Sequence, residues 1–365
     1  MSRRLELRVL PRPTATPTQV IVGAGLLEGL ARAQREAFPR ARRFLVFVDE
    51  RLLSDEVDAA WGSRRLVGSG AVALPEGERS KTREVHAFLE DRILDAGITR
   101  DDAVVAIGGG AVLDAVGYGA ATARRGVPWI AVPTSVVAIA DASIGGKTAI
   151  NHARGKNLLG AFHAPGLVLA DVATLSTLPR RDFVAGLAEV WKAGVVGDPT
   201  ILKALRDGPP ESDDALEECL CAAIRVKARL VEEDERDEGV RRALNYGHTV
   251  GHALETVLGP DAVRHGEAVA IGMGVAAQIA CRRGLVDAAF TARQDADLER
   301  LALPTRVPAS ADGRRVREAI GADKKRRAGA THTWVLPLAA GGVRIVEDVT
   351  DDEIDAALDA RSARR

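Results

Sequence analysis

The chain has 365 residues, a hydrophobic content of 46% and a nearly balanced charge, with 50 basic and 51 acidic side chains. This length suits about two domains, and the charge balance argues against nucleic acid or an anionic membrane as the partner. No apolar stretch is long enough for a signal peptide or a membrane span. The three cysteines show neither disulfide-framework nor zinc-ribbon spacing, so we expect a soluble, cytoplasmic protein.

The first half alternates short β-rich runs with helical segments, and each run leads into a turn residue. The predicted strands cover residues 19–22, 44–48, 103–107, 128–132 and 167–170. Strand, turn, helix and strand at this spacing predict a parallel sheet with crossover helices. Beyond residues 172–180 the pattern changes to long helices. We therefore predict an α/β, Rossmann-like domain over 1–175 and a mainly α-helical domain over 176–365, which ends in a solvated helix.

Two features of the first half indicate a nucleotide site. The run AVVAIGGGAVLD (103–114) reads as a strand, three glycines and a helix. Glycine lets backbone N–H groups approach a phosphate, and a helix N-terminus adds partial positive charge. The run lacks the GxGxxG spacing, so a tight strand-to-helix turn remains the alternative. Asp49, which ends an earlier strand, is placed to bond a ribose hydroxyl, although carboxylates are also common at strand ends on surfaces.

A glycine-rich segment, SIGGKTAINHARGKN (143–157), carries Lys147, Lys156 and Asn157. It is not a P-loop, because Asp141 stands where that motif needs glycine. We expect an anion-holding loop, with a solvated loop as the alternative.

Charged residues also occupy apolar helical faces. Glu189 and Lys192 lie three apart among small, apolar neighbours in the predicted helix 181–196, which favours a cleft wall over a surface ion pair. Lys227 lies in an otherwise apolar stripe of the next long helix. It either extends its ammonium out to water or is a buried cation that binds an anion.

The stretch RRALNYGHTVGHALE (241–255) predicts one helix that aligns Arg241, Asn245, His248 and His252 on a single stripe. Two glycines in it, at 247 and 251, would each weaken the helix by roughly 1 kcal/mol relative to alanine. We take them to allow close packing of another element.

A third imidazole, His265, precedes a further apolar helix. Glu189, His248 and His265 would together form a divalent metal site that leaves a position open for a substrate oxygen. Nitrogen and oxygen ligands suit zinc or cobalt. HTVGH lacks the glutamate of HExxH, so a metalloprotease is unsupported. The many cations around these motifs indicate a phosphorylated, acidic substrate.

Taken together, these motifs resemble the 3-dehydroquinate synthases of the sugar phosphate cyclase superfamily. The resemblance covers about residues 19–340 and is densest at 124–162, 185–194, 243–255 and 265–274. It implies an NAD- and metal-dependent lyase of the shikimate pathway, which makes precursors of aromatic amino acids. Such an enzyme converts 3-deoxy-arabino-heptulosonate 7-phosphate to 3-dehydroquinate and phosphate by oxidation, elimination, reduction and an internal aldol reaction.

The resemblance also implies roles for single residues. It gives the metal to Glu189, His248 and His265, and the active-site acid to Asp141. The cations that hold substrate match Lys147, Lys156, Lys192, Lys227, Arg241 and either Lys324 or Lys325, and the polar positions match Asn157, Asn245 and His252, the last a phosphate neighbour. The expected NAD contacts are Asp49, Glu78, Lys81, Gly109, Gly110, Asp114, Thr134 and Ser135. Arg125 matches an arginine that reaches across a dimer interface, so we expect a homodimer.

Two departures from the family pattern bear on the substrate. AVLDAVGY (111–118) replaces the usual residues after the triple glycine, and EVWKAG lacks an aromatic residue after its lysine. Both leave another sugar phosphate cyclase, such as an aminodehydroquinate synthase, as the alternative. The retained Lys227, Arg241 and GGK favour a carboxylated substrate. A metal-dependent polyol dehydrogenase shares the two-domain plan but would have no use for so many cations.

Overall fold

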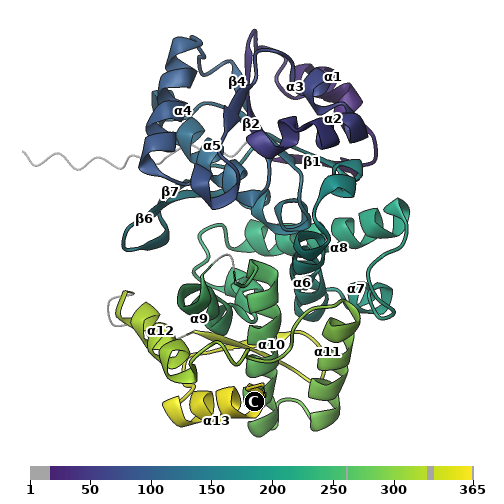
Figure 1. The fold of residues 1–365 in the computed structure, drawn as a ribbon, viewed down its shortest axis with the longest axis vertical. Helices are drawn as coiled ribbons and strands as arrows, with labels where there is room; N and C mark the ends of the chain where they lie inside the picture. Colours follow the sequence, from purple (N-terminus) through teal and green to yellow (C-terminus); the bar gives the residue numbers. More distant parts are fainter. Residues whose placement is uncertain (1–16, 260–261, 327–332, 364–365) are drawn as a thin grey trace, which may run out of the picture.

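The computed structural model of the protein describes residues 17–259, 262–326 and 333–363, and for 322–326 it describes only the backbone. A parallel sheet with its helices forms one half of the molecule, and an array of helices forms the other (Figure 1). This arrangement confirms the predicted fold class. Among the described residues, no helix combines the length and the apolarity needed to cross a membrane.

Within the described residues the main sheet has six parallel strands in the order β1-β8-β5-β4-β2-β3. Their bounds are β1 (Gln19–Gly23), β2 (Phe44–Asp49), β3 (Val72–Leu74), β4 (Ala103–Gly108), β5 (Trp129–Pro133) and β8 (Leu167–Asp171). All five predicted strands are confirmed. The sixth, β3, was not predicted because three residues are too few to show a periodic pattern.

Helices cover both faces of this sheet, as Figure 1 shows for α4 and α5 on one side and α1, α2 and α3 on the other. Val104 and Ala106 of β4 belong to the same core as Leu89 of α4, whereas Val105 and Ile107 share a core with Leu30 of α1. A strand that is buried on both faces reads as a continuous apolar run, as this one does. The bounds are α1 (Leu30–Ala37), α2 (Asp55–Trp61), α3 (Ser63–Val67), α4 (Arg83–Asp95) and α5 (Gly110–Thr122), with short helices η1 (Leu26–Gly29), η2 (Glu50–Leu53), η3 (Gly77–Ser80), η4 (Ala123–Arg125) and η6 (Val172–Thr177).

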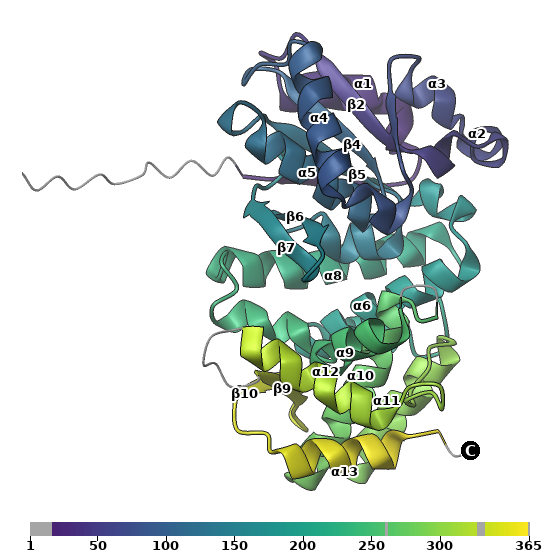
Figure 2. The same cartoon turned by 60° about the vertical axis from the view of Figure 1, so that its left-hand side comes forward.

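The segment expected to be an anion-holding loop is instead an antiparallel hairpin, formed by β6 (Lys147–His152) and β7 (Gly155–Phe162). Figure 2 shows this hairpin between the sheet half and the helical half. The loop prediction failed because glycines and lysines dilute the alternation that marks a strand. One of the glycines is needed for the pairing itself, since a Cβ on Gly160 would overlap the Thr148 carbonyl on the facing strand.

The other half consists mainly of helices, which confirms the predicted change of pattern and the final helix. Helices α6, α9, α11 and α13 pack around α10, which is buried along most of its length. The bounds are α6 (Arg180–Val196), α7 (Pro199–Ala204), α8 (Asp213–Glu233), η7 (Val240–Asn245), α9 (His248–Leu258), α10 (His265–Arg282), α11 (Ala288–Arg300), α12 (Gly313–Arg326) and α13 (Asp351–Arg361), with a two-stranded sheet of β9 (Trp334–Pro337) and β10 (Val343–Val346).

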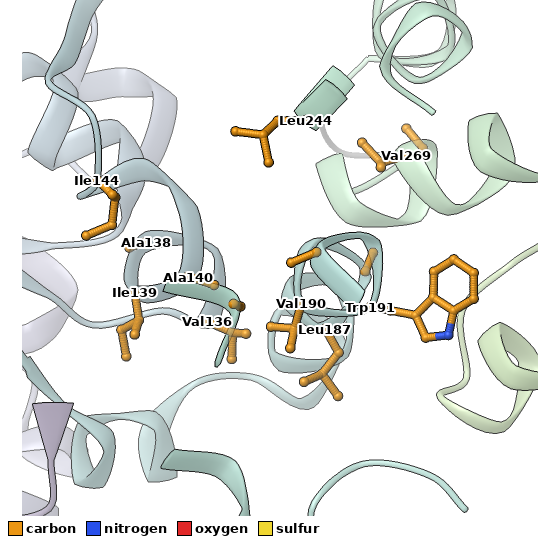
Figure 3. Close-up of a cluster of buried hydrophobic side chains, with 14 of the residues drawn as sticks. Val136, Ala138, Ile139, Ala140, Ile144, Leu187, Val190, Trp191, Leu244 and Val269 are labelled. Atoms are coloured by element: carbon orange, nitrogen blue, oxygen red, sulfur yellow. The ribbon is translucent and has the colours of Figure 1, made fainter. Parts of the chain in front are cut away.

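The hydrophobic core continues from the sheet half into the helical half. Figure 3 shows Val136 and Ile139, from the segment after β5, beside Leu187 and Val190 of α6. Helix α6 can approach this segment only because residue 186 is glycine, since a Cβ there would overlap the Val136 side chain. The close approach brings α6 next to η5 (Ala138–Ala142), a π-helical turn.

The prediction of one helix over 241–255 was wrong. The short helix η7 ends at Asn245, the backbone turns at Gly247 with φ +84°, and α9 begins at His248. The expectation of close packing at the two glycines is confirmed. A Cβ on Gly247 would lie 2.5 Å from the Val269 carbonyl oxygen of α10, and a Cβ on Gly251 would lie 3.3 Å from Ala268.

Candidate active site

Glu189, His248 and His265 come from three helices and meet at one point. Glu189 lies in the middle of α6, whereas the two histidines are the first residues of α9 and α10. Glu189 Oε1 lies 3.6 Å from His248 Nε2 and 3.4 Å from His265 Nε2. One ligand atom of each residue lies within 4.8 Å of the other two, so a single ion could contact all three.

The Glu189 carboxylate is buried, and neither of its oxygens accepts a hydrogen bond of regular geometry from the described residues. Burial alone would raise its pKa, but the Lys192 ammonium and the two imidazoles hold the pKa well below its usual range. A buried, ionised carboxylate that faces two imidazoles is a donor set that fits zinc or a similar divalent cation.

Each imidazole directs its Nε2 to Glu189 because its Nδ1 has another partner. Nδ1 of His248 lies 3.3 Å from the Tyr246 carbonyl oxygen, and Nδ1 of His265 lies 3.2 Å from Glu255 Oε2. Burial and the nearby Lys192 lower the pKa of His248 well below its usual value. Burial would also lower the pKa of His265, but the two neighbouring carboxylates, Glu189 and Glu255, raise it to about 10. The two histidines therefore sit in different electrostatic surroundings.

Buried charges continue from Glu189 toward the sheet half. Lys192 contacts Glu189, and Lys227 donates hydrogen bonds of 2.6 Å to both the carbonyl oxygen and Oδ1 of Asp141 on η5. Lys192 and Lys227 are 2% and 7% exposed, so the surface-pair and solvated-lysine alternatives are both wrong. Burial lowers the pKa of Lys227. Burial alone would raise the pKa of Asp141, but the nearby Lys227 ammonium lowers it below its usual value.

A cavity of about 470 Å³ opens beside this chain of charges. Its charged lining residues are Asp114, Asp141, Lys147, Lys227 and Arg241. The guanidinium of Arg241 donates to the Glu235 carbonyl oxygen at 2.7 Å, and Lys147 contacts Asp237. The three proposed metal ligands are not in the lining, but the nearby charges of Glu189 and Lys192 both act on the pKa of Asp141, which is in the lining. The cavity and the Glu189 cluster are therefore neighbouring parts of one site.

The hairpin contributes two further residues. Asn157 lines the cavity in a left-handed conformation with φ +57°, and its Oδ1 contacts Lys81. Lys156 is partly exposed, and its Nζ lies 3.1 Å from Glu255 Oε1 of α9. The hairpin therefore connects the sheet half with the helix that begins at His248.

The other residues predicted to bind substrate or to act in catalysis differ in their distance from the Glu189 cluster. His252 is on the exposed side of α9, with its ring 5.2 Å from that of His248. Asn245 borders a separate, small gap with Gly247 and Trp334 and does not line the cavity. Arg125 is exposed in a left-handed turn with φ +63°. Lys324 and Lys325 belong to α12, but their side chains lie outside the described part of the structure.

The expected dinucleotide residues gather at the carboxyl ends of β2, β4 and β5, where ligands of doubly wound sheets bind. Asp49 is buried and accepts a hydrogen bond from the Arg51 N–H, and Gly109 and Gly110 begin α5. Thr134 donates its N–H to the Gly108 carbonyl, while Ser135 Oγ would lie 3.8 Å from a Cβ on Gly109. These residues therefore lie at the same end of the sheet, the carboxyl end of its strands.

Glu78 and Lys81 lie on the segment between β3 and α4. Glu78 accepts from Asn151 Nδ2 at 2.6 Å, and the buried Lys81 pairs with Asp114 of α5. Burial raises the pKa of Asp114, against the opposing effect of Lys81. This segment therefore joins the strand ends to the hairpin.

Sequence reasoning missed two carboxylates, Glu255 and Asp237. Glu255 lies seven residues after His248 and three after His252, so the helical period of α9 could have revealed it. Asp237 lies in an irregular segment with φ +61°. No periodic signal marks such a position.

Models of two families match the chain, 3-dehydroquinate synthase N-terminal over residues 71–185 and 3-dehydroquinate synthase C-terminal over residues 186–326. The 3-dehydroquinate synthase of Symbiobacterium thermophilum is 41% identical over 348 residues, which cover 93% of this chain and 97% of the relative. That of Geobacter metallireducens is 47% identical over 279 residues, covering 75% and 77%.

Among solved structures, ValA, the 2-epi-5-epi-valiolone synthase from Streptomyces hygroscopicus with NAD+ and Zn2+ bound, is 30% identical with a TM-score of 0.84. The match covers 97% of this chain and 99% of that chain. The chain belongs to the 3-dehydroquinate synthase family.

Proposed function

We propose that the protein is a 3-dehydroquinate synthase, a phosphorus–oxygen lyase that forms 3-dehydroquinate and phosphate from 3-deoxy-arabino-heptulosonate 7-phosphate. The observation that carries the proposal is the Glu189, His248 and His265 cluster beside a cavity lined by Lys147, Lys227 and Arg241. Relatives that match over most of the chain have the same activity in their names.

The chain would hold two cofactors, NAD and a divalent metal such as zinc or cobalt. Glu189, His248 and His265 would bind the metal, which suits the buried carboxylate between two Nε2 atoms. NAD would supply reversible hydride transfer to and from the substrate, and the metal would supply polarisation of the reacting oxygen. The proposed NAD contacts are Asp49, Glu78, Lys81, Gly109, Gly110, Asp114, Thr134 and Ser135.

The cations of the cavity would bind an anionic substrate. Lys227 and Arg241 are buried, so their charges are poorly screened by water and attract a carboxylate or phosphate strongly. Asp141 would be the acidic residue of the active site, held in place by Lys227 at 2.6 Å. Additional contacts to the substrate are proposed for Lys147, Lys156, Asn157, Lys192, Asn245, His252 and Lys324.

A second copy of the chain would complete the site. Arg125 is exposed in η4, directly after α5, which suits an arginine that serves a partner. We therefore propose a homodimer in the cytoplasm, in which residues 1–175 of each chain bind NAD and residues 176–365 bind metal and most of the substrate.

The test is a phosphate-release assay with purified protein, Zn2+ and NAD at a concentration below that of the substrate. The heptulosonate phosphate should yield many phosphates per NAD without accumulation of NADH, because the hydride returns in each turnover. The Lys227→Met variant serves as a matched control, and its turnover should fall at least about a hundredfold. Phosphate release from the imino analogue of the heptulosonate phosphate, but not from the heptulosonate phosphate itself, would identify an aminodehydroquinate synthase. Formation of one NADH per molecule of a simple polyol oxidised would identify a dehydrogenase.

A further inference from the structure

Glu255 belongs to the same face of α9 as the candidate ligand His248. Residues 248, 252 and 255 recur at helical spacing, so their side chains form one stripe along α9 (His248–Leu258). The Glu255 side chain is only 12% exposed. A carboxylate that is this far buried requires partners, because burial without them disfavours its charged form.

The two oxygens of Glu255 have different partners. Oε2 lies 3.2 Å from His265 Nδ1, and Oε1 lies 3.1 Å from Lys156 Nζ. His265 begins α10, whereas Lys156 comes from the hairpin of the sheet half. One carboxylate thus joins a proposed metal ligand to a proposed substrate cation across the two halves of the molecule.

The contact with His265 determines which nitrogen of the imidazole is available to a metal. An Nδ1–H that donates to Glu255 leaves the lone pair on Nε2, and Nε2 is the atom 3.4 Å from Glu189. The other imidazole is oriented by a backbone carbonyl, that of Tyr246. Glu255 is therefore the side chain on which the orientation of His265 depends.

We propose that Glu255 is a positioning residue, which fixes the tautomer and orientation of His265 and holds Lys156 toward the substrate phosphate. The proposal rests on the metal-dependent cyclase activity proposed above. It adds one residue that affects both the affinity for the metal and the affinity for the substrate. Loss of Glu255 is expected to weaken both through two independent contacts.

Glu255 could instead be a ligand, because His252, Glu255 and His265 also have ligand atoms within 4.8 Å of one another. Two observations favour the positioning role. Glu255 has Lys156 at one oxygen and His265 Nδ1 at the other, whereas Glu189 faces the Nε2 atoms of both His248 and His265. His252 is also exposed, and an exposed ligand would leave the ion open to water.

The experiment compares full-length wild type with Glu255→Gln, Glu255→Asp, Lys156→Met and Glu232→Gln, an exposed carboxylate on α8 as the control. Zn2+ affinity is measured by chelator competition in the absence of NAD and substrate, and urea unfolding checks the fold. Glu255→Gln should keep one Zn2+ per chain but bind it about 10- to 100-fold more weakly. Lys156→Met and Glu232→Gln should remain within about threefold of wild type, and Glu255→Asp should fall between Gln and wild type.

Kinetics at saturating Zn2+ test the second contact. For Glu255→Gln the kcat should recover toward wild type while the KM for the heptulosonate phosphate stays about tenfold high, as in Lys156→Met. The double variant Glu255→Gln with Lys156→Met should have a KM no higher than that of either single variant, because each single change already removes the contact between these two side chains. Wild-type Zn2+ affinity in Glu255→Gln, or additive KM effects, would overturn the proposal. Loss of bound Zn2+ in Glu255→Gln but not in Glu189→Gln would also overturn it, since Glu255 would then be a ligand. The Zn2+ measurement needs no turnover, so it is independent of whether the proposed activity is found.

Discussion

Glu189 and Lys192 form an ion pair inside the protein, where α6 would ordinarily carry aliphatic side chains. They are 3% and 2% exposed, and the pair contributes little to stability on balance, because the cost of removing both charges from water offsets their attraction. A change that removes one partner is different, because it leaves the other charge buried and uncompensated. The pair is therefore better explained by function than by stability.

The change Glu189→Gln should have two separable effects. It should destabilise the fold by about 3 kcal/mol, because the Lys192 ammonium stays buried without a counter-charge. It should also abolish measurable Zn2+ binding, because the amide removes the charged ligand. Urea unfolding and metal content after dialysis measure the two effects. The double change Glu189→Gln with Lys192→Met should regain much of the stability but none of the metal. A metal-replete double variant would contradict the assignment of Glu189 as a ligand.

Where α9 meets α10, glycines set how close the two helices come. Gly247, Gly251 and Gly272 lie at this contact, and a Cβ on Gly272 would overlap the Gly247 carbonyl oxygen. The sequence pattern predicted a close approach at two of these glycines but not the break at Gly247. A left-handed glycine that ends one helix leaves the same spacing of polar residues as a glycine inside a helix. Periodicity alone could not separate the two cases.

The change Gly272→Ala should therefore push the start of α9, where His248 lies, away from the middle of α10 and so alter the distance between His248 and His265. We expect a loss of about 1–3 kcal/mol in the free energy of unfolding, typical of overpacking, and weaker Zn2+ binding. The matched control is Gly321→Ala in α12, where a Cβ would meet nothing within 4 Å. That change should be neutral or stabilise by up to about 1 kcal/mol through helix propensity. Equal effects of the two changes would show that the absence of a Cβ at Gly272 does not set the distance between α9 and α10.

Contacts between the two halves lie beyond what the sequence pattern could predict. Hydrophobic periodicity identified the sheet strands and the helical half, because burial leaves a local signal. It could not identify the pairing of Lys156 with Glu255, which are 99 residues apart, or of Lys147 with Asp237, which are 90 apart. The hairpin between these partners was also missed. The proposed metal ligands could be predicted because Glu189 interrupts an apolar helical pattern, His248 lies in a stripe of polar residues and His265 directly precedes an apolar helix. The side chains that contact these ligands were visible only in the fold.

The C-terminal helix gives the stability of the protein a defined pH dependence. Arg283, at the end of α10, holds both oxygens of Glu353 in α13 at 2.6 and 2.8 Å. These hydrogen bonds lower the pKa of Glu353 from 4.5 to about 2. Because the folded pKa is the lower one, the charged carboxylate stabilises the folded state above pH 4.5, and this contribution is lost as the pH falls toward about 2.

The change Glu353→Gln keeps a side-chain oxygen for the N-terminal cap of α13 but removes the charge. At pH 7 it should lower the free energy of unfolding by roughly 1 kcal/mol, a value that allows for solvent screening of this partly exposed pair. The difference from wild type should shrink as the pH falls from 4.5 to about 2, where both side chains are neutral. Urea unfolding across that range measures it. Asp352→Asn, an exposed change in the same helical turn, is the control and should cost only a few tenths of a kcal/mol at pH 7. A difference between Glu353→Gln and wild type that stayed constant down to the lowest pH would mean that Arg283 does not hold the ionised carboxylate of Glu353.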